Sequence, residues 1–186
     1  TAWSEVVGLR EGDRYLIVSP MFHVSGHKTG VLACLTAGAT MYPHAVFDPA
    51  VVMRRVQDER ITMLPGPPTI YQAMLEHPQR HEFDLSSLRL AVTGAAAIPP
   101  VLVERMRDEL GFTRVVTAYG VTETTGVVTM CDASDDAWTI AETSGRAIPG
   151  VEVRIAPGSG EILVRGYNVM AGYLDDPEAT AAAIDG

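Results

Sequence analysis

Short apolar runs alternate with longer segments of helical period through the first part of the chain. The runs predict strands at residues 14–19, 40–43, 61–64, 88–93 and 114–118. The segments between them predict helices at residues 25–37, 49–60, 67–77 and 99–111. Strands that alternate with helices of this length are typical of an α/β fold with a layered, mostly parallel sheet.

Several helix ends carry signals of their own. Gly38 and Gly111 follow two of the predicted helices, and glycine readily takes the left-handed conformation that ends a helix. Asp48 precedes Pro49, which is the order of an N-cap residue followed by a proline suited to the first turn. These signals support the predicted limits of the helices.

The pattern changes near residue 138. Residues 151–155 and 161–165 alternate apolar and polar side chains, and Pro157-Gly158-Ser159-Gly160 between them is typical of a turn. This arrangement predicts a half-exposed antiparallel hairpin. Asp175-Asp176-Pro177 then predicts the start of a short final helix.

The composition narrows the classes of function. The chain is 47% hydrophobic and 20% charged, which is ordinary for a globular protein. Its net charge of −9 and the lack of a basic stripe argue against nucleic acid as a partner. Cys34 and Cys131 lack metal-ligand spacing and fit a reduced, cytoplasmic protein. No apolar run approaches the length of a membrane span, and no feature bears on the oligomeric state.

Residues 119–126 carry the main chemical signal. They follow the predicted strand 114–118 and combine an aromatic ring, glycine, hydroxyls and the carboxylate of Glu123. Thr93-Gly94-Ala95-Ala96 follows the preceding strand, and ligands of parallel α/β sheets bind beyond the carboxyl ends of strands. By itself, the first segment is equally consistent with a surface turn in which Thr122 caps a helix.

Several motifs in collinear order resemble those of one superfamily. Tyr119-Gly120-Val121-Thr122-Glu123 resembles the core adenylation motif of acyl-CoA synthetases, luciferases and peptide-synthetase adenylation domains. Residues 20–26 resemble its Pro-x-Phe-His motif, and residues 94–99 resemble its adenine-side loop. Within the superfamily, the chain is most similar to actinobacterial fatty-acid and steroid-ring acyl-CoA ligases. Further matching segments lie at residues 145–151, 160–166 and 169–173.

The resemblance implies a reaction and its co-substrates. Such enzymes use ATP with Mg²⁺ to convert a carboxylic acid into an acyl-adenylate, and coenzyme A then displaces AMP. Charge grows on phosphate oxygens, so the site needs cations and oriented donors. By resemblance, Tyr119 stacks on adenine, Thr122 binds the α-phosphate and Glu123 binds Mg²⁺. The other implied nucleotide contacts are Gly94, Ala95 and Ala96 at the base edge, and Thr117, Ala118, Gly120 and Val121 at the junction with the acyl carboxylate.

The resemblance also places His23 between the nucleotide and the acyl group, in contact with the acyl carboxylate. The alternative for His23 is an ordinary histidine at a strand end. Ser25, Gly26 and Val121 would contact the substrate, and the small residues leave room for a bulky acid. The predicted catalytic residues are Thr122, Glu123 and His23.

The resemblance covers essentially the whole chain but only part of such an enzyme. A phosphate-binding loop should precede it, and a Thr-Gly-Asp segment and a mobile C-terminal domain should follow. We therefore expect a fragment, with residues 1–137 in the α/β subdomain of an adenylation domain and 138–186 beginning a small antiparallel β-barrel-like subdomain. We expect the intact protein to be an acyl-CoA ligase and the fragment to be inactive. The alternatives are an adenylating enzyme with a carrier protein or oxygen as acceptor, and a non-catalytic nucleotide-binding module.

Overall fold

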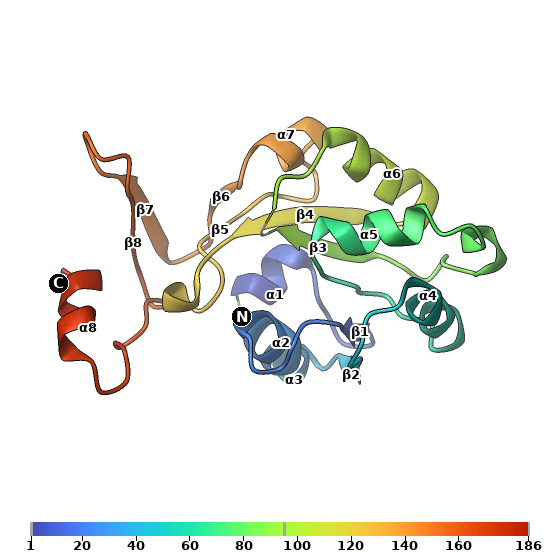
Figure 1. Ribbon diagram of the computed structural model, residues 1–186, viewed down its shortest axis with the longest axis horizontal. Helices are drawn as coiled ribbons and strands as arrows, with labels where there is room; N and C mark the ends of the chain where they lie inside the picture. Colours follow the sequence, from blue (N-terminus) through green and yellow to red (C-terminus); the bar gives the residue numbers. More distant parts are fainter. Residues whose placement is uncertain (1, 95, 186) are drawn as a thin grey trace.

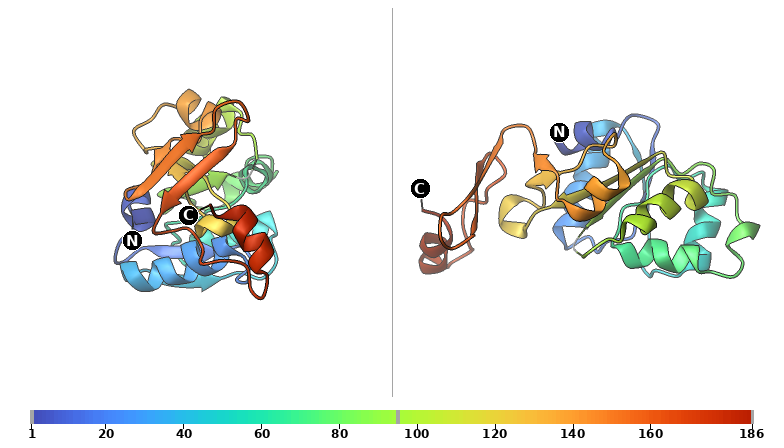
Figure 2. Two further views of the ribbon diagram at one scale, coloured as in Figure 1. Left: turned by 90° about the vertical axis from the view of Figure 1, so that its left-hand side faces the viewer. Right: turned by 90° about the horizontal axis from the view of Figure 1, so that it is seen from above.

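The computed structural model describes residues 2–94 and 96–185. They form a layered α/β body and a smaller C-terminal extension made of the last two strands and the last helix (Figure 1). The view from above shows the extension projecting from one end of the body (Figure 2, right). No helix in the described part of the chain combines the length and the apolar character needed to cross a membrane.

Two pairs of parallel strands form the main part of the sheet. Strand β1 (Arg14–Ile17) pairs with β2 (Thr40–Pro43), and β3 (Leu90–Gly94) pairs with β4 (Arg114–Tyr119). Met63 connects the two pairs, because it forms a parallel bridge to β1 on one side and to β3 on the other. The predicted layered α/β fold with a mostly parallel sheet is confirmed.

The segment predicted as a strand at residues 61–64 is reduced to this single bridged residue. Arg60 before it has a positive φ of 49°, and Pro65 after it has no N–H to donate. These two residues leave too few positions for a regular strand. The segment still exchanges backbone hydrogen bonds with β1 and β3, so it holds the two pairs of strands together.

The far edge of the sheet is antiparallel. Strand β5 (Thr129–Met130) pairs with the end of β4, and β6 (Arg146–Ala147) pairs with β5. Helix α7 (Ala137–Glu142), which the sequence pattern did not predict, packs against β4 and against α6 (Pro100–Leu110). The Asp136 carboxylate caps the first turn of α7.

Helices cover both faces of the sheet (Figure 1). Helices α4 (Pro49–Asp58), α5 (Pro68–Leu75) and α6 lie on one face, together with α7. Helices α1 (Ala2–Val7) and α3 (Ala33–Ala37) lie on the other. Each face buries its own cluster of apolar side chains, so the sheet is the middle layer of three.

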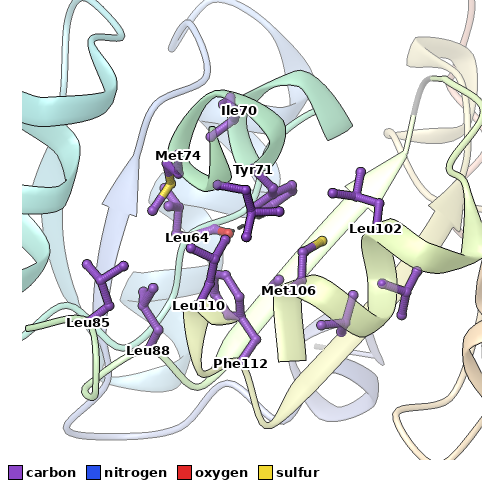
Figure 3. Packing of buried hydrophobic residues seen from close by; sticks show 14 of the residues in the cluster. Leu64, Ile70, Tyr71, Met74, Leu85, Leu88, Leu102, Met106, Leu110 and Phe112 are labelled. Carbon is purple, nitrogen blue, oxygen red and sulfur yellow. Dashed lines mark hydrogen bonds between the residues drawn. The ribbon is translucent and has the colours of Figure 1, made fainter. Parts of the chain in front are cut away.

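Tyr71 of α5 anchors the larger cluster (Figure 3). Its buried ring meets Phe112 edge-on, with 5.7 Å between the ring centres. Its hydroxyl donates a hydrogen bond of 2.9 Å to the Leu64 carbonyl. Met106 and Leu110 of α6 belong to the same cluster, so α5, α6 and the sheet are held together by one group of contacts.

The helix-end signals at Gly38, Asp48 and Gly111 are confirmed. The Asp48 carboxylate accepts a hydrogen bond of 2.9 Å from the Val51 N–H at the start of α4. Gly38 follows α3 with a φ of 71°, and Gly111 follows α6 with a φ of 83°. Both glycines take the left-handed conformation that an L-residue adopts only with strain.

The predicted antiparallel hairpin is also confirmed. Strand β7 (Val151–Ile155) pairs with β8 (Ile162–Gly166), and helix α8 (Pro177–Ala183) follows, capped by Asp176. Within the described residues, β7 and β8 pair with each other alone. The hairpin is therefore open, and the described residues contain no closed barrel. The predicted boundary near residue 137 stays a prediction.

Candidate active site

The two turns predicted to bind a ligand lie side by side at the carboxyl ends of β3 and β4. The two strands are in parallel register, with Gly94 paired to Ala118. A Cβ at Gly94 would lie 2.6 Å from the Ala118 carbonyl oxygen, so glycine is required for this close approach. Ala96 is exposed on the first turn, whereas Ala95 lies outside the described residues. The first turn is thus held against the end of β4.

The loop after β4 closes on itself. The Gly126 N–H donates a hydrogen bond of 2.9 Å to the Val121 carbonyl. Gly120 lies so close to Gly126 that a Cβ at Gly120 would meet the Gly126 backbone at 2.5 Å. Tyr119 is half-buried at the start of this loop, while Val121 and Thr122 are exposed on it. The loop therefore presents two of the predicted contact residues to solvent from a fixed backbone.

Glu123 carries an ionised carboxylate on the same loop. Its Oε1 accepts a hydrogen bond of 2.8 Å from the Tyr173 hydroxyl. The Glu123 backbone N–H, and then this hydroxyl, lower the pKa of the Glu123 carboxyl below its ordinary value. The side chain is therefore charged at neutral pH, which suits a hard cation such as Mg²⁺. The described residues contain no group of three or more His, Cys, Asp or Glu able to hold a metal, so a cation here depends on one carboxylate and on ligand oxygens.

A segment of the C-terminal extension fastens this loop, and we call residues 166–173 the strap. Asn168 in the strap is only 4% exposed. Its side-chain amide donates to the carbonyls of Thr124 at 3.1 Å and Val127 at 2.7 Å. In return, the Thr125 hydroxyl donates to the Asn168 carbonyl at 2.6 Å. These three bonds fix the backbone on the carboxyl side of Glu123.

The strap also contacts Glu123 directly. The Met170 N–H donates to the Glu123 carbonyl at 2.7 Å, in addition to the bond from Tyr173 to the carboxylate. Residues 169–173 matched a family motif in the sequence but carried no predicted role, and Asn168 was not among the predicted residues. The tyrosine in that segment was the available signal, but its partner is 50 residues away in the sequence.

His23 is held by a local turn. Its Nδ1 accepts a hydrogen bond of 3.1 Å from the Ser25 N–H, as the N-cap of α2 (Val24–Gly26). In the neutral tautomer that this bond selects, the proton is on Nε2, and the side chain is exposed. A Cβ at Gly26 would lie 2.2 Å from the Pro20 carbonyl oxygen, so glycine is required to close this turn.

The His23 turn lies next to the loop after β4. Gly126 in that loop has a φ of 85°, and a Cβ on it would lie 2.9 Å from Cγ2 of Val24. Val24 directly follows His23, so this contact brings two of the predicted motifs together. The helix then continues through a π-helical turn, His27–Leu32, before α3. The predicted helix at 25–37 is therefore present but not uniform, and π-helical turns are frequent at functional sites.

Thr117 has internal partners. Its hydroxyl donates to the Ile140 carbonyl of α7 at 3.0 Å and lies 3.0 Å from the Cys131 sulfur. The side chain therefore ties α7 to β4 within the apolar layer. A nucleotide contact from Thr117 stays a prediction, as do the contacts of Ala118 and Tyr119.

Comparison with known proteins identifies the family. The model of the AMP-binding enzyme family matches residues 1–174. The chain belongs to the AMP-binding enzyme family. Its fold and its collinear motifs agree with this membership, and the resemblance noted in the sequence is confirmed.

Several curated and solved proteins resemble this chain. It is 60% identical over 184 residues to a 3-[(3aS,4S,7aS)-7a-methyl-1,5-dioxo-octahydro-1H-inden-4-yl]propanoyl:CoA ligase of Rhodococcus jostii, with 99% of this chain and 35% of the relative covered. A fatty acyl CoA synthetase structure from Mycobacterium tuberculosis has a TM-score of 0.90 at 28% identity, covering 100% of this chain and 38% of that one. An O-succinylbenzoate coenzyme A synthetase structure from Bacillus subtilis, in complex with ATP and magnesium ion, has a TM-score of 0.83 at 27% identity, with 98% and 39% covered. The chain thus spans only 35% of the length of its Rhodococcus relative.

Proposed function

We propose that the whole protein is an ATP-dependent ligase that joins a carboxylic acid to coenzyme A. The observation that supports this best is the convergence of three motifs. The close approaches at Gly94 and Gly126 bring the adenine-side turn, the Tyr119 loop and the His23 turn together at the carboxyl ends of β3 and β4. Ligands of α/β sheets bind at such an edge. The names of the Rhodococcus relative and the solved neighbours point to the same reaction.

In this proposal, the nucleotide binds over the two neighbouring turns. Gly94 and Ala96 bring backbone close to the adenine edge, and Tyr119 packs on its face. Thr122 donates a hydrogen bond to the α-phosphate from its exposed position. Glu123 binds Mg²⁺, which neutralises phosphate charge when bound. A single ionised carboxylate on a solvent-accessible loop fits a cation that keeps several waters and takes further ligands from substrate phosphates.

The acid binds between the same loop and His23. The His23 Nε2–H donates to the acid's carboxylate, because Nδ1 is already occupied by the Ser25 N–H. One carboxylate oxygen attacks the α-phosphorus, and the bond to pyrophosphate breaks. The sulfur of coenzyme A then attacks the acyl carbon, its thiol proton is lost and AMP leaves. Ser25, Gly26 and Val121 contribute to the acyl side of the site.

We propose that these 186 residues do not catalyse the reaction alone. Pyrophosphate departure needs cations close to the leaving group. Lys28 is the only lysine of the chain, and it belongs to the π-helical turn rather than to the loop of Thr122. The chain also covers only 35% of its Rhodococcus relative, so the missing cations are expected from the remainder of the protein.

The acid is proposed to resemble the one in the Rhodococcus relative's name, a propanoate side chain on a two-ring diketone. The 60% identity across nearly the whole chain supports this choice. We also propose that the protein works in the cytoplasm. Its two cysteines, Cys34 and Cys131, are free and buried, as expected for a reduced protein.

The test uses the full-length protein with the diketone propanoate, ATP, Mg²⁺ and coenzyme A. We expect pyrophosphate release and an acyl-CoA product by mass spectrometry. Glu123→Gln keeps the side-chain shape but removes the charge, and it should slow adenylate formation by about a hundredfold. If the variant kept the wild-type Mg²⁺-dependent rates, Glu123 would not be the Mg²⁺ ligand. Absence of product with every acid of a broad panel would refute the ligase proposal. If the enzyme preferred a carrier protein to coenzyme A, the acyl acceptor would be a carrier protein instead.

A further inference from the structure

The strap holds the Glu123 loop through two kinds of hydrogen bond, one kind to the loop backbone and one to the Glu123 side chain. Hydrogen bonds from Asn168 and Met170 hold backbone carbonyls, and the bond of 2.8 Å from the Tyr173 hydroxyl holds the carboxylate of Glu123. Within the described residues, Tyr173 is the one other residue hydrogen-bonded to that carboxylate. The orientation of the Glu123 side chain therefore depends on a residue that the proposed mechanism does not use.

We propose that Tyr173 is a positioning residue that orients the Glu123 carboxylate to bind the divalent cation of the nucleotide. This inference rests on the proposed function. The hydroxyl bonds to Oε1, which limits rotation of the carboxylate. Mg²⁺ demands nearly ideal octahedral geometry, so a carboxylate that is free to rotate binds it less well. Partners that orient metal ligands commonly contribute to affinity in this way.

Because the backbone and the side chain are held by different hydrogen bonds, the orienting role of Tyr173 can be tested apart from its contribution to folding. Tyr173→Phe removes the hydroxyl but keeps the ring. The backbone bonds from Asn168 and Met170 remain, so the loop and the strap should stay folded. A loss that appears in cation binding, but not in folding or in binding of the acid, then reports the orientation of the carboxylate.

Tyr167 provides a matched control in the same strap. Its side chain is 68% exposed, and its hydroxyl forms no hydrogen bond within the described part of the chain. Its ring lies against Gly150, where a Cβ would be 3.1 Å away. Tyr167→Phe therefore removes a tyrosine hydroxyl from the strap without touching Glu123.

The experiment uses full-length protein with Mn²⁺ as the probe cation and a non-hydrolysable ATP analogue. Free Mn²⁺ is measured by electron paramagnetic resonance, and the Mg²⁺ dependence of pyrophosphate release is measured in parallel. We expect Tyr173→Phe to weaken Mn²⁺ binding about tenfold and to raise the apparent Mg²⁺ constant about as much. The rate at saturating Mg²⁺, the KM for the acid and the melting temperature should stay near wild type. Tyr167→Phe should match the wild type throughout.

The double variant decides whether Tyr173 acts through Glu123. In the Glu123→Gln background, Tyr173→Phe should add no further loss of Mn²⁺ affinity. Wild-type Mn²⁺ affinity in Tyr173→Phe, with a loss in Glu123→Gln, would overturn the inference but leave the proposed function intact. An additive loss in the double variant, or a fall in melting temperature without any change in Mn²⁺ affinity, would overturn it as well. If the wild type bound no Mn²⁺ with the nucleotide and released no pyrophosphate, both proposals would fall.

Discussion

Gly94→Ala tests how the two ligand-binding turns are built. In the structure, a Cβ at residue 94 would lie 2.6 Å from the Ala118 carbonyl oxygen, whereas ordinary van der Waals contacts begin at 3.4 Å. The ends of β3 and β4 would therefore have to move apart by the difference, 3.4 − 2.6 = 0.8 Å. The obstacle is backbone rather than a flexible side chain, so it cannot move aside without disturbing the strand.

We expect two measurable effects in the full-length protein. Forcing the extra methyl into the sheet should reduce the free energy of unfolding by about 1–3 kcal/mol, visible as a lower melting temperature. Displacing one turn from the other should also lower kcat/KM for ATP by about 10- to 100-fold, because misplacements near 1 Å can cost about a hundredfold. Pyrophosphate release measured against ATP concentration gives the second quantity.

Gly158→Ala in the β7–β8 turn separates these two effects. Gly158 has a φ of 87° and no atom within 4 Å of an added Cβ, so alanine there introduces backbone strain without a clash. It should lower stability by about 1–2 kcal/mol and leave kcat/KM for ATP unchanged. If Gly94→Ala kept the wild-type melting temperature and ATP kinetics, the argument that this glycine holds the two turns together would be refuted.

Two further predictions concern the body of the fold. Asp13 is only 4% exposed, accepts a hydrogen bond of 2.8 Å from the Thr62 hydroxyl and forms an ion pair with Arg89. Asp13→Ala removes the ion-pair partner of the half-buried Arg89 guanidinium. It should therefore reduce the free energy of unfolding by about 3 kcal/mol. Thermal unfolding of that variant checks this, and an unchanged melting temperature would contradict it. Burial, with a smaller effect of Asp13, raises the pKa of the Cys34 thiol to about 12, so at pH 8 it stays protonated. Iodoacetamide should modify Cys34 in urea but not in the folded protein, as peptide mass spectrometry would show, and rapid modification of the folded protein would count against this environment.

Local signals made most of the helices and of the parallel strands predictable. Strand β2 has the bounds expected from the sequence, and Gly38, Asp48 and Gly111 mark helix ends as predicted. Each of these signals acts through backbone conformation or a hydrogen bond to a nearby residue. The resemblance to a family added the order of the motifs, which no single element supplied.

Contacts between distant segments were not predictable from local pattern. Helix α7 is short, and its place is set by packing on β4 and by the bond from the Thr117 hydroxyl to the Ile140 carbonyl. The segment at 61–64 has strand-like composition, but Arg60 and Pro65 at its ends leave only Met63 paired with the neighbouring strands. The bond between Tyr173 and Glu123 joins residues 50 positions apart, which spacing rules within one element cannot reveal.

This separation in sequence has a consequence for synthesis of the protein. The sheet register that pairs Gly94 with Ala118 needs only residues that precede the strap, whereas the side chains that fasten Glu123 are translated later. Until the strap is available, the loop of Glu123 lacks its hydrogen bonds from Asn168, Met170 and Tyr173. Emergence of Tyr173 from the ribosome is therefore the earliest moment at which that loop can be completed.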